Sequence, residues 1–213
     1  MNWQDATLLF VTLIISLTVH EAAHALVAYW GGDRTAYRGG QVTLNPLPHI
    51  QREPFGMLIL PIVALLLSGG RSTFGFAHAP YDPIWAHHHP KRAALMAAAG
   101  PFANVLLATL AFAILWFLGR PASGEGEAVR QIAGQFLYLN LLLAVFNILP
   151  LPPLDGAAVL GGLSRTARNL FDGLQRIPYM GLVVFVLLIR YVDDLFWPVF
   201  RTVNGWLPVP FGR

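Results

Sequence analysis

The sequence of 213 residues contains no cysteine, and only 12% of its residues are charged. The missing cysteines exclude disulfide bonds and thiolate metal sites. A soluble domain carries about 25% charged residues, so the low charge, together with 55% hydrophobic residues, argues against a soluble protein. The net charge of +3 is small and is not gathered in a basic run, so we expect no nucleic-acid partner.

Long apolar runs take the place of the missing charges. A helix that spans the membrane needs about 20 mostly apolar residues. Runs that reach or approach this length cover 6–30, 93–118, 131–149 and 179–199. The sequence therefore predicts an all-α polytopic membrane protein with about four spanning helices, the last near 179–199. We expect one integral membrane domain over 1–213, with a core at 6–165.

Two shorter segments break this pattern. The apolar segment 55–70 has only 16 residues and a central proline, Pro61, which favours a re-entrant segment over a crossing. Residues 35–46 mix β-formers with turn residues and predict a small β element. A strand there could pair with an unwound substrate.

The first apolar run contains the motif His20-Glu21-Ala22-Ala23-His24. Residues four apart share a helix face, so both imidazoles can bind one Zn²⁺ ion. Glu21 is then placed to act as general base on a metal-bound water. The alternative is a pair of helix histidines that bond to backbone or water, but ionisable groups within a membrane helix are costly and usually functional.

A catalytic zinc site needs three protein ligands, and two histidines are not enough. Asp155 is the best further candidate, because it follows a proline-broken helix and stands among aliphatic residues. The alternative for Asp155 is an ordinary N-cap of the helix that begins at Gly156. Beside an incomplete zinc site, we favour the ligand.

Three motifs together resemble the site-2 protease family (peptidase family M50) of intramembrane zinc metalloproteases. They are the HExxH motif, AAGPFAN at 98–104 and NILPLPPLDG at 147–156. The segments GGQVTLNPLPHI (39–50) and FGFAHAP (74–80) resemble the short members without PDZ or CBS domains. The resemblance covers roughly residues 8 to 165, and it departs from many relatives at QREPFG (51–56).

The resemblance implies His20, His24 and Asp155 as zinc ligands and Glu21 as the catalytic acid and base. It also implies that Asn104 and Asn147 contact the substrate or the oxyanion. From the residues alone, an interhelical hydrogen bond explains either amide about equally well. His49 and Glu53 could reach the metal region, although a solvated loop pair is the simpler interpretation. The loop histidines His87–His89 could bind metal transiently, although interfacial histidines are the simpler interpretation.

If the three ligands converge, the helices at 6–30 and 131–149 run in one direction and the helix at 93–118 in the other. Nine basic residues then lie on the side of the zinc site and five on the opposite side, which favours an active site near the cytoplasmic face with both termini outside. We expect a multi-pass protein of the cell membrane whose partners are the lipid bilayer and a transmembrane protein or peptide substrate. A non-proteolytic zinc-binding membrane protein, either a transporter or an inactive scaffold, is the alternative, and the oligomeric state stays open.

Overall fold

The computed structural model describes residues 2–120 and 123–211, and all regular structure in these ranges is helical. The helices are α1 (Trp3–Gly31), α2 (Thr35–Arg38), α3 (Pro46–Arg52), the π-helical turn η1 (Phe55–Ile59), α4 (Leu60–Leu67), α5 (Pro83–His88), α6 (Pro90–Leu118), α7 (Gly124–Asn147), α8 (Asp155–Leu163), α9 (Arg165–Gln175), α10 (Met180–Arg190), α11 (Val192–Leu195) and α12 (Trp197–Gly205). The predicted fold class, an all-α membrane protein, is confirmed.

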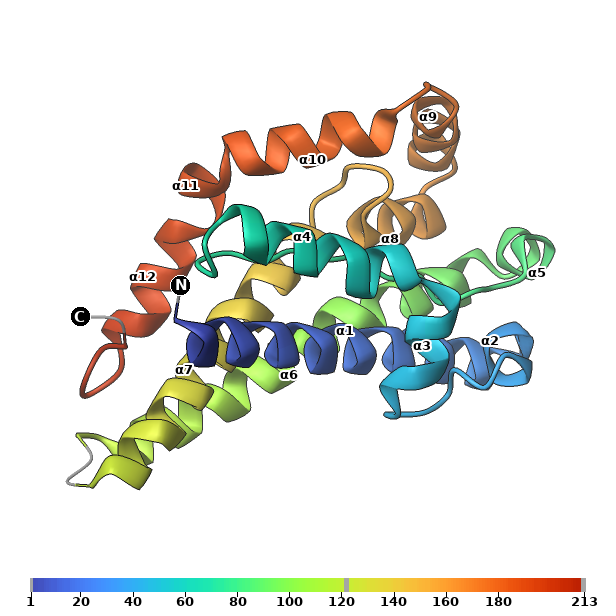
Figure 1. Ribbon diagram of the computed structural model, residues 1–213. Coiled ribbons are helices and arrows are strands. Elements are labelled where there is room, and N and C mark those ends of the chain that lie inside the picture. The colour runs from blue at the N-terminus through green and yellow to red at the C-terminus, as the bar shows by residue number, and fades with distance from the viewer. Residues whose placement is uncertain (1, 121–122, 212–213) are drawn as a thin grey trace.

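Three helices, α1, α6 and α7, are long and apolar enough to cross a membrane. Local signals set their ends: the side chain of Asn2 accepts a hydrogen bond from the backbone of Gln4, Gly32 ends α1 in the left-handed conformation, and Pro90 occupies the first turn of α6. The three helices pack against one another (Figure 1). They coincide with three of the four predicted spans.

The prediction of one continuous spanning helix at 179–199 is wrong. This part of the chain is divided among α10, α11 and α12. Two exposed aspartates, Asp193 and Asp194, interrupt the apolar run, and Pro198 occupies the first turn of α12. Phe196 and Phe200 pack against the ring of Tyr138 on α7, at centroid distances of 5.2 and 5.6 Å, so this end of the chain returns to the bundle.

The short apolar segment begins with a sharp change of direction. Helix α3 meets the η1–α4 segment at 111°, as in a broken span or a re-entrant loop. After α4 the chain returns in an extended stretch to α5, which lies on the same side of the molecule as α2 (Figure 1). The backbone N–H of Phe76 donates to the carbonyl of Gly56, which ties the returning stretch to η1. Re-entry of 55–70 stays a prediction.

The small β element expected near 35–46 is wrong, since no strand occurs anywhere in 2–120 or 123–211. Polar side chains at both ends of the segment start helices in its place. Asp33 accepts hydrogen bonds from the backbone and hydroxyl of Thr35, at 2.8 and 2.6 Å, before α2. Asn45 caps α3 by accepting from Leu47. Only a few residues remain between the two helices, and the idea of a substrate-pairing strand there fails with the strand.

Small residues let the long helices approach closely, and large ones face outward. Ala97, Ala103, Ala108 and Ala111 are all buried on α6. Phe117, on the same helix, is 87% exposed. An apolar outer surface with small residues at the helix contacts is the pattern expected for a bundle in lipid.

Candidate metal centre

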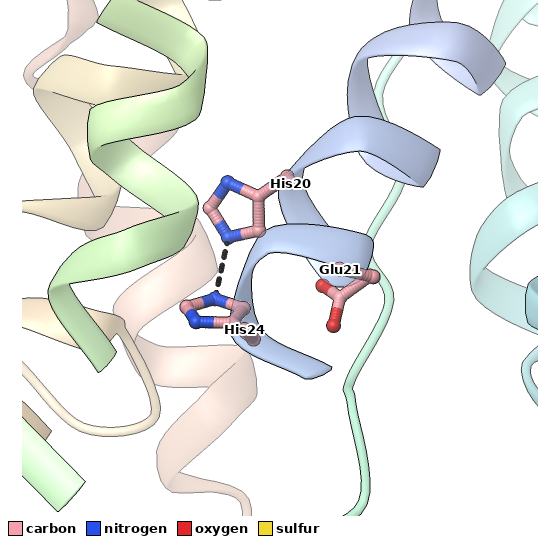
Figure 2. Close-up of side chains that lie close together, drawn as sticks. All are labelled: His20, Glu21 and His24. Atoms are coloured by element: carbon pink, nitrogen blue, oxygen red, sulfur yellow. Dashed lines mark hydrogen bonds between the residues drawn. The ribbon is translucent and has the colours of Figure 1, made fainter. Parts of the chain in front are cut away.

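His20 and His24 lie one turn apart on α1, in its half nearer to α2. Their Nε2 atoms are 3.0 Å apart, and the two rings meet edge to face. Figure 2 shows both rings on one side of α1 and the Glu21 side chain on another. Both histidines are buried, at 4% and 6% exposure, so solvent does not explain the pairing.

Asp155, the first residue of α8, brings its carboxylate to the same point. Its Oδ2 lies 3.0 Å from Nε2 of His20, and its Oδ1 lies 3.4 Å from Nε2 of His24. The N-cap of α8 is Leu154, and no side chain caps that helix. The carboxylate of Asp155 is therefore turned toward the histidines, which disfavours the alternative that it serves as a cap.

The outer nitrogens of both rings are already bonded. Nδ1 of His24 donates to the carbonyl of Met96, at 2.7 Å, and Nδ1 of His20 donates to Oδ1 of Asn104. A carbonyl can only accept, so Nδ1 of His24 carries the proton. In the neutral ring, Nε2 is then a bare lone pair. The same holds for His20 if the amide of Asn104 is fixed with its oxygen toward the ring.

A chain of hydrogen bonds fixes that amide. Nδ2 of Asn140 donates to the carbonyl of Phe136 and to the hydroxyl of Ser16, both at 2.9 Å. Oδ1 of Asn140 must then face Asn104, whose Nδ2 donates to it at 2.8 Å. Oδ1 of Asn104 consequently faces His20. A backbone carbonyl of α7 thus sets the tautomer of a histidine on α1.

Gly100 on α6 leaves the space beside the two nitrogens open. A β-carbon at this position would lie 2.3 Å from Nε2 of His24 and 2.5 Å from Nε2 of His20. Both distances are far below van der Waals contact. The histidine pair needs a glycine at this turn of α6.

The three donors fit a zinc ion. Tetrahedral bonds of about 2.0–2.1 Å separate neighbouring donors by about 3.3 Å, close to the observed separations of 3.0, 3.0 and 3.4 Å. Two bare lone pairs and a carboxylate repel one another unless a cation lies among them. The hydrogen bonds on each Nδ1 are also those that zinc-binding histidines need.

Glu21 completes the cluster but differs from the other three residues. Its carboxylate lies within 4.8 Å of the ligand atoms of His20 and His24. It is only 3% exposed, and its Oε2 has no hydrogen-bond partner among the described residues. A buried carboxylate oxygen without a partner is costly in the folded state, which points to a partner such as a bound water.

The other residues singled out from the sequence are distributed as follows. Asn104 is fully buried, and its amide is engaged with His20 and Asn140, which favours the interhelical alternative. Asn147 is half-buried and donates only to the carbonyl of Leu143 among the described residues. Within the described residues, no hydrogen bond joins it to His20 or His24. Its role stays a prediction.

The loop candidates lie outside the cluster. His49 is buried, and its Nε2 bonds to the carbonyl of Thr43 at 3.0 Å, so it is not a solvated loop residue. Glu53 lies 3.8 Å from His78. His87–His89 are exposed.

Asn140 and Ser16 were missed by the sequence analysis. Both signals were present: Asn140 is a side-chain amide among leucines in an apolar run, and Ser16 precedes His20 by four residues on the same face of α1.

Comparison with known proteins identifies relatives of this chain. The family model of peptidase family M50 matches residues 8–136. YwhC of Bacillus subtilis (strain 168) is 36% identical over 200 residues, 90% of this chain and 84% of YwhC. Rip2 of Mycobacterium tuberculosis (strain H37Rv) is 34% identical over 197 residues, 91% of this chain and 67% of Rip2. Rip2 of Mycolicibacterium smegmatis is 32% identical over 151 residues, 69% of this chain and 53% of that protein.

All three relatives carry a provisional name as zinc metalloproteases. No solved structure matches the chain significantly. The fold and the site define a membrane protein of the metalloprotease class. The chain belongs to peptidase family M50, the site-2 protease family.

Proposed function

We propose that this protein is an intramembrane zinc metalloprotease that hydrolyses peptide bonds in or near the transmembrane helices of membrane-anchored substrates. The observation that carries the proposal is the convergence of His20 Nε2, His24 Nε2 and the Asp155 carboxylate beside a separate buried carboxylate, Glu21. A store or transporter of zinc explains the first three residues but gives Glu21 no task.

His20, His24 and Asp155 would hold the zinc. Bound zinc supplies a Lewis acid for the scissile carbonyl and makes a water molecule acidic enough to attack at neutral pH. Asn104 and Met96 keep the two imidazoles in the tautomer that presents Nε2. Gly100 keeps the approach to both nitrogens free of side-chain atoms.

Glu21 moves the protons. Its Oε2, which bonds to no other residue that the structure describes, would accept a proton from the attacking water and return that proton to the leaving amine.

The orientation is part of the proposal. The site lies in the half of α1 nearer to α2, and the short helices α2 and α5 stand at that end of the molecule (Figure 1). Basic residues concentrate in the segments at this end, among them Arg34, Arg38, Lys91 and Arg92. The positive-inside rule then makes this face cytoplasmic.

The test compares wild type with Glu21→Gln in proteoliposomes that hold a single-span substrate, with zinc content measured on the same samples. We expect Glu21→Gln to keep one zinc and to lose at least about 100-fold in cleavage rate, because general acid–base catalysis contributes about that much or more. Glu53→Gln, outside the cluster, is the matched control and should cleave normally. Cleavage that is equal in wild type and Glu21→Gln would contradict the proposal and favour a zinc-binding protein without hydrolysis.

A further inference from the structure

Helix α9 is amphipathic over its whole length, and none of its residues is buried. Ala167, Leu170, Phe171 and Leu174 recur at the spacing that forms one stripe along a helix. The opposite stripe is polar and basic; it contains Arg165, Arg168, Asn169 and Asp172, and Arg176 follows at the C-cap. Leu170 is 60% exposed, and Ala167, Phe171 and Leu174 are half-buried, so the apolar stripe is only partly covered by the rest of the chain.

The position of α9 matches the level of a membrane surface. Gly162, near the end of α8, lies against Pro90, the first residue of the spanning helix α6; a β-carbon on Gly162 would be 2.5 Å from the carbonyl of Pro90. Ser164 then caps α9 by accepting from Ala167. Helix α9 therefore begins where a spanning helix begins, on the same side of the molecule as α2 and α5 (Figure 1).

The direction of α9 agrees with this level. It meets the apolar helix α10 at 100°. If α10 leads into the bilayer, α9 therefore lies parallel to the membrane surface. Exposed apolar residues continue past both ends of α9: Leu163 is 66% exposed and Ile177 is 47% exposed.

We propose that α9 lies in the plane of the membrane. Its apolar stripe then contacts the acyl chains, and its arginines contact anionic lipid headgroups. A strongly amphipathic helix with a basic polar face is the type that binds such a surface. Three arginines against one aspartate give the polar side a charge of +2, complementary to an anionic leaflet. Arg168 also donates to the carbonyl of Gly161, so Arg165 and Arg176 are the arginines left for lipid.

The absence of cysteine makes a direct test possible, because single cysteines can be placed along α9 and spin-labelled. The whole chain would be reconstituted in phosphatidylcholine vesicles with and without phosphatidylglycerol. Collision rates with oxygen, which enters lipid, and with a water-soluble nickel chelate would be measured at each position from 165 to 175. We expect the collision rates to oscillate along the sequence with the helical period, and the depth of the labels to show no steady change along the helix. The oxygen collision rate at Leu170→Cys should be several-fold higher than at Asn169→Cys.

The charge requirement is tested in the same vesicles. Phosphatidylglycerol should move the Leu170→Cys label deeper, and Arg165→Gln with Arg176→Gln should abolish this shift. Arg201→Gln, an exposed arginine on α12, is the matched control. Three results would overturn the proposal: nickel access at every position, a steady gradient of depth that marks a crossing, or a Leu170→Cys label that meets neither reagent because protein covers it. Zinc content and cleavage are not needed for the readout, so failure here is separate from failure of the proposed protease.

Discussion

Gly100 on α6 and His24 on α1 are in such close contact that a single added methyl group would lie 2.3 Å from the nitrogen Nε2. The same methyl group would lie 2.5 Å from Nε2 of His20. The missing side chain of Gly100 thus leaves room for both imidazoles at the point where the candidate metal ligands converge. The glycine belongs to the site although it has no functional group.

Replacing Gly100 by alanine should therefore empty the site of zinc while leaving the helices folded. The methyl group would occupy the space beside both Nε2 atoms, and neither α6 nor α1 can shift without disturbing the other buried contacts. Zinc per chain, measured by atomic emission after purification, should fall from about one to near zero. Gly124→Ala is the control, because none of the described residues places an atom within 4 Å of the added β-carbon there. Full zinc content in Gly100→Ala would show that the ion does not bind at these nitrogens.

The hydrogen-bond chain from Phe136 to His20 predicts an effect at a distance from the metal. Asn140→Ala removes the group that orients Asn104, so the His20 ring loses its fixed tautomer. Loss of such an outer partner typically weakens metal binding about 10- to 100-fold. Competition with a chelator measures this affinity. Asn169→Ala, an exposed amide on α9, should leave the affinity unchanged, and an unchanged affinity in Asn140→Ala as well would remove the chain from the account.

Replacing Arg130 on α7 should change the stability of the fold and leave zinc binding unchanged. Arg130 is buried, and its guanidinium donates to the carbonyls of Gly119, Val209 and Pro210 at 2.7–3.0 Å. Arg130→Ala should lower the free energy of unfolding by about 1.5–3 kcal/mol, the usual size for hydrogen bonds to a charged group.

Thermal unfolding in detergent should show the loss for Arg130→Ala as a lower Tm, with one zinc still bound below that temperature. Arg201→Ala, exposed on α12, should leave the Tm nearly unchanged. Equal Tm values for the two variants would mean that the carbonyl contacts of Arg130 do not stabilise the fold.

The sequence predicted the parts of this structure that depend on local spacing. His20 and His24 share a helix face because four residues make about one turn, and the apolar runs of α1, α6 and α7 are long enough to cross lipid. Asp155 could be chosen because few other ionisable residues stand beside a broken apolar helix.

The parts that failed depend on side chains acting at a segment's ends or across helices. Asp33 accepts from the backbone of Thr35 at the start of α2 and Asn45 caps α3, so short helices form on either side of Val42 and Thr43 despite the β propensity between them. The run at 179–199 has the length of a span but contains the Asp193–Asp194 pair. Asn140 could not be linked to His20 from the sequence, since that link depends on how α1, α6 and α7 are rotated about their axes.

The central claim is that His20, His24 and Asp155 hold one zinc ion. X-ray absorption at the zinc edge tests it most directly, because it counts the ligand atoms and gives their distances. Wild type should show two imidazole nitrogens with carboxylate and water oxygens, all at about 2.0–2.2 Å. His20→Ala and His24→Ala should each lose zinc, and so should Asp155→Ala. A zinc ion that keeps the same spectrum in Asp155→Ala would contradict the account, since the third ligand would then be another residue.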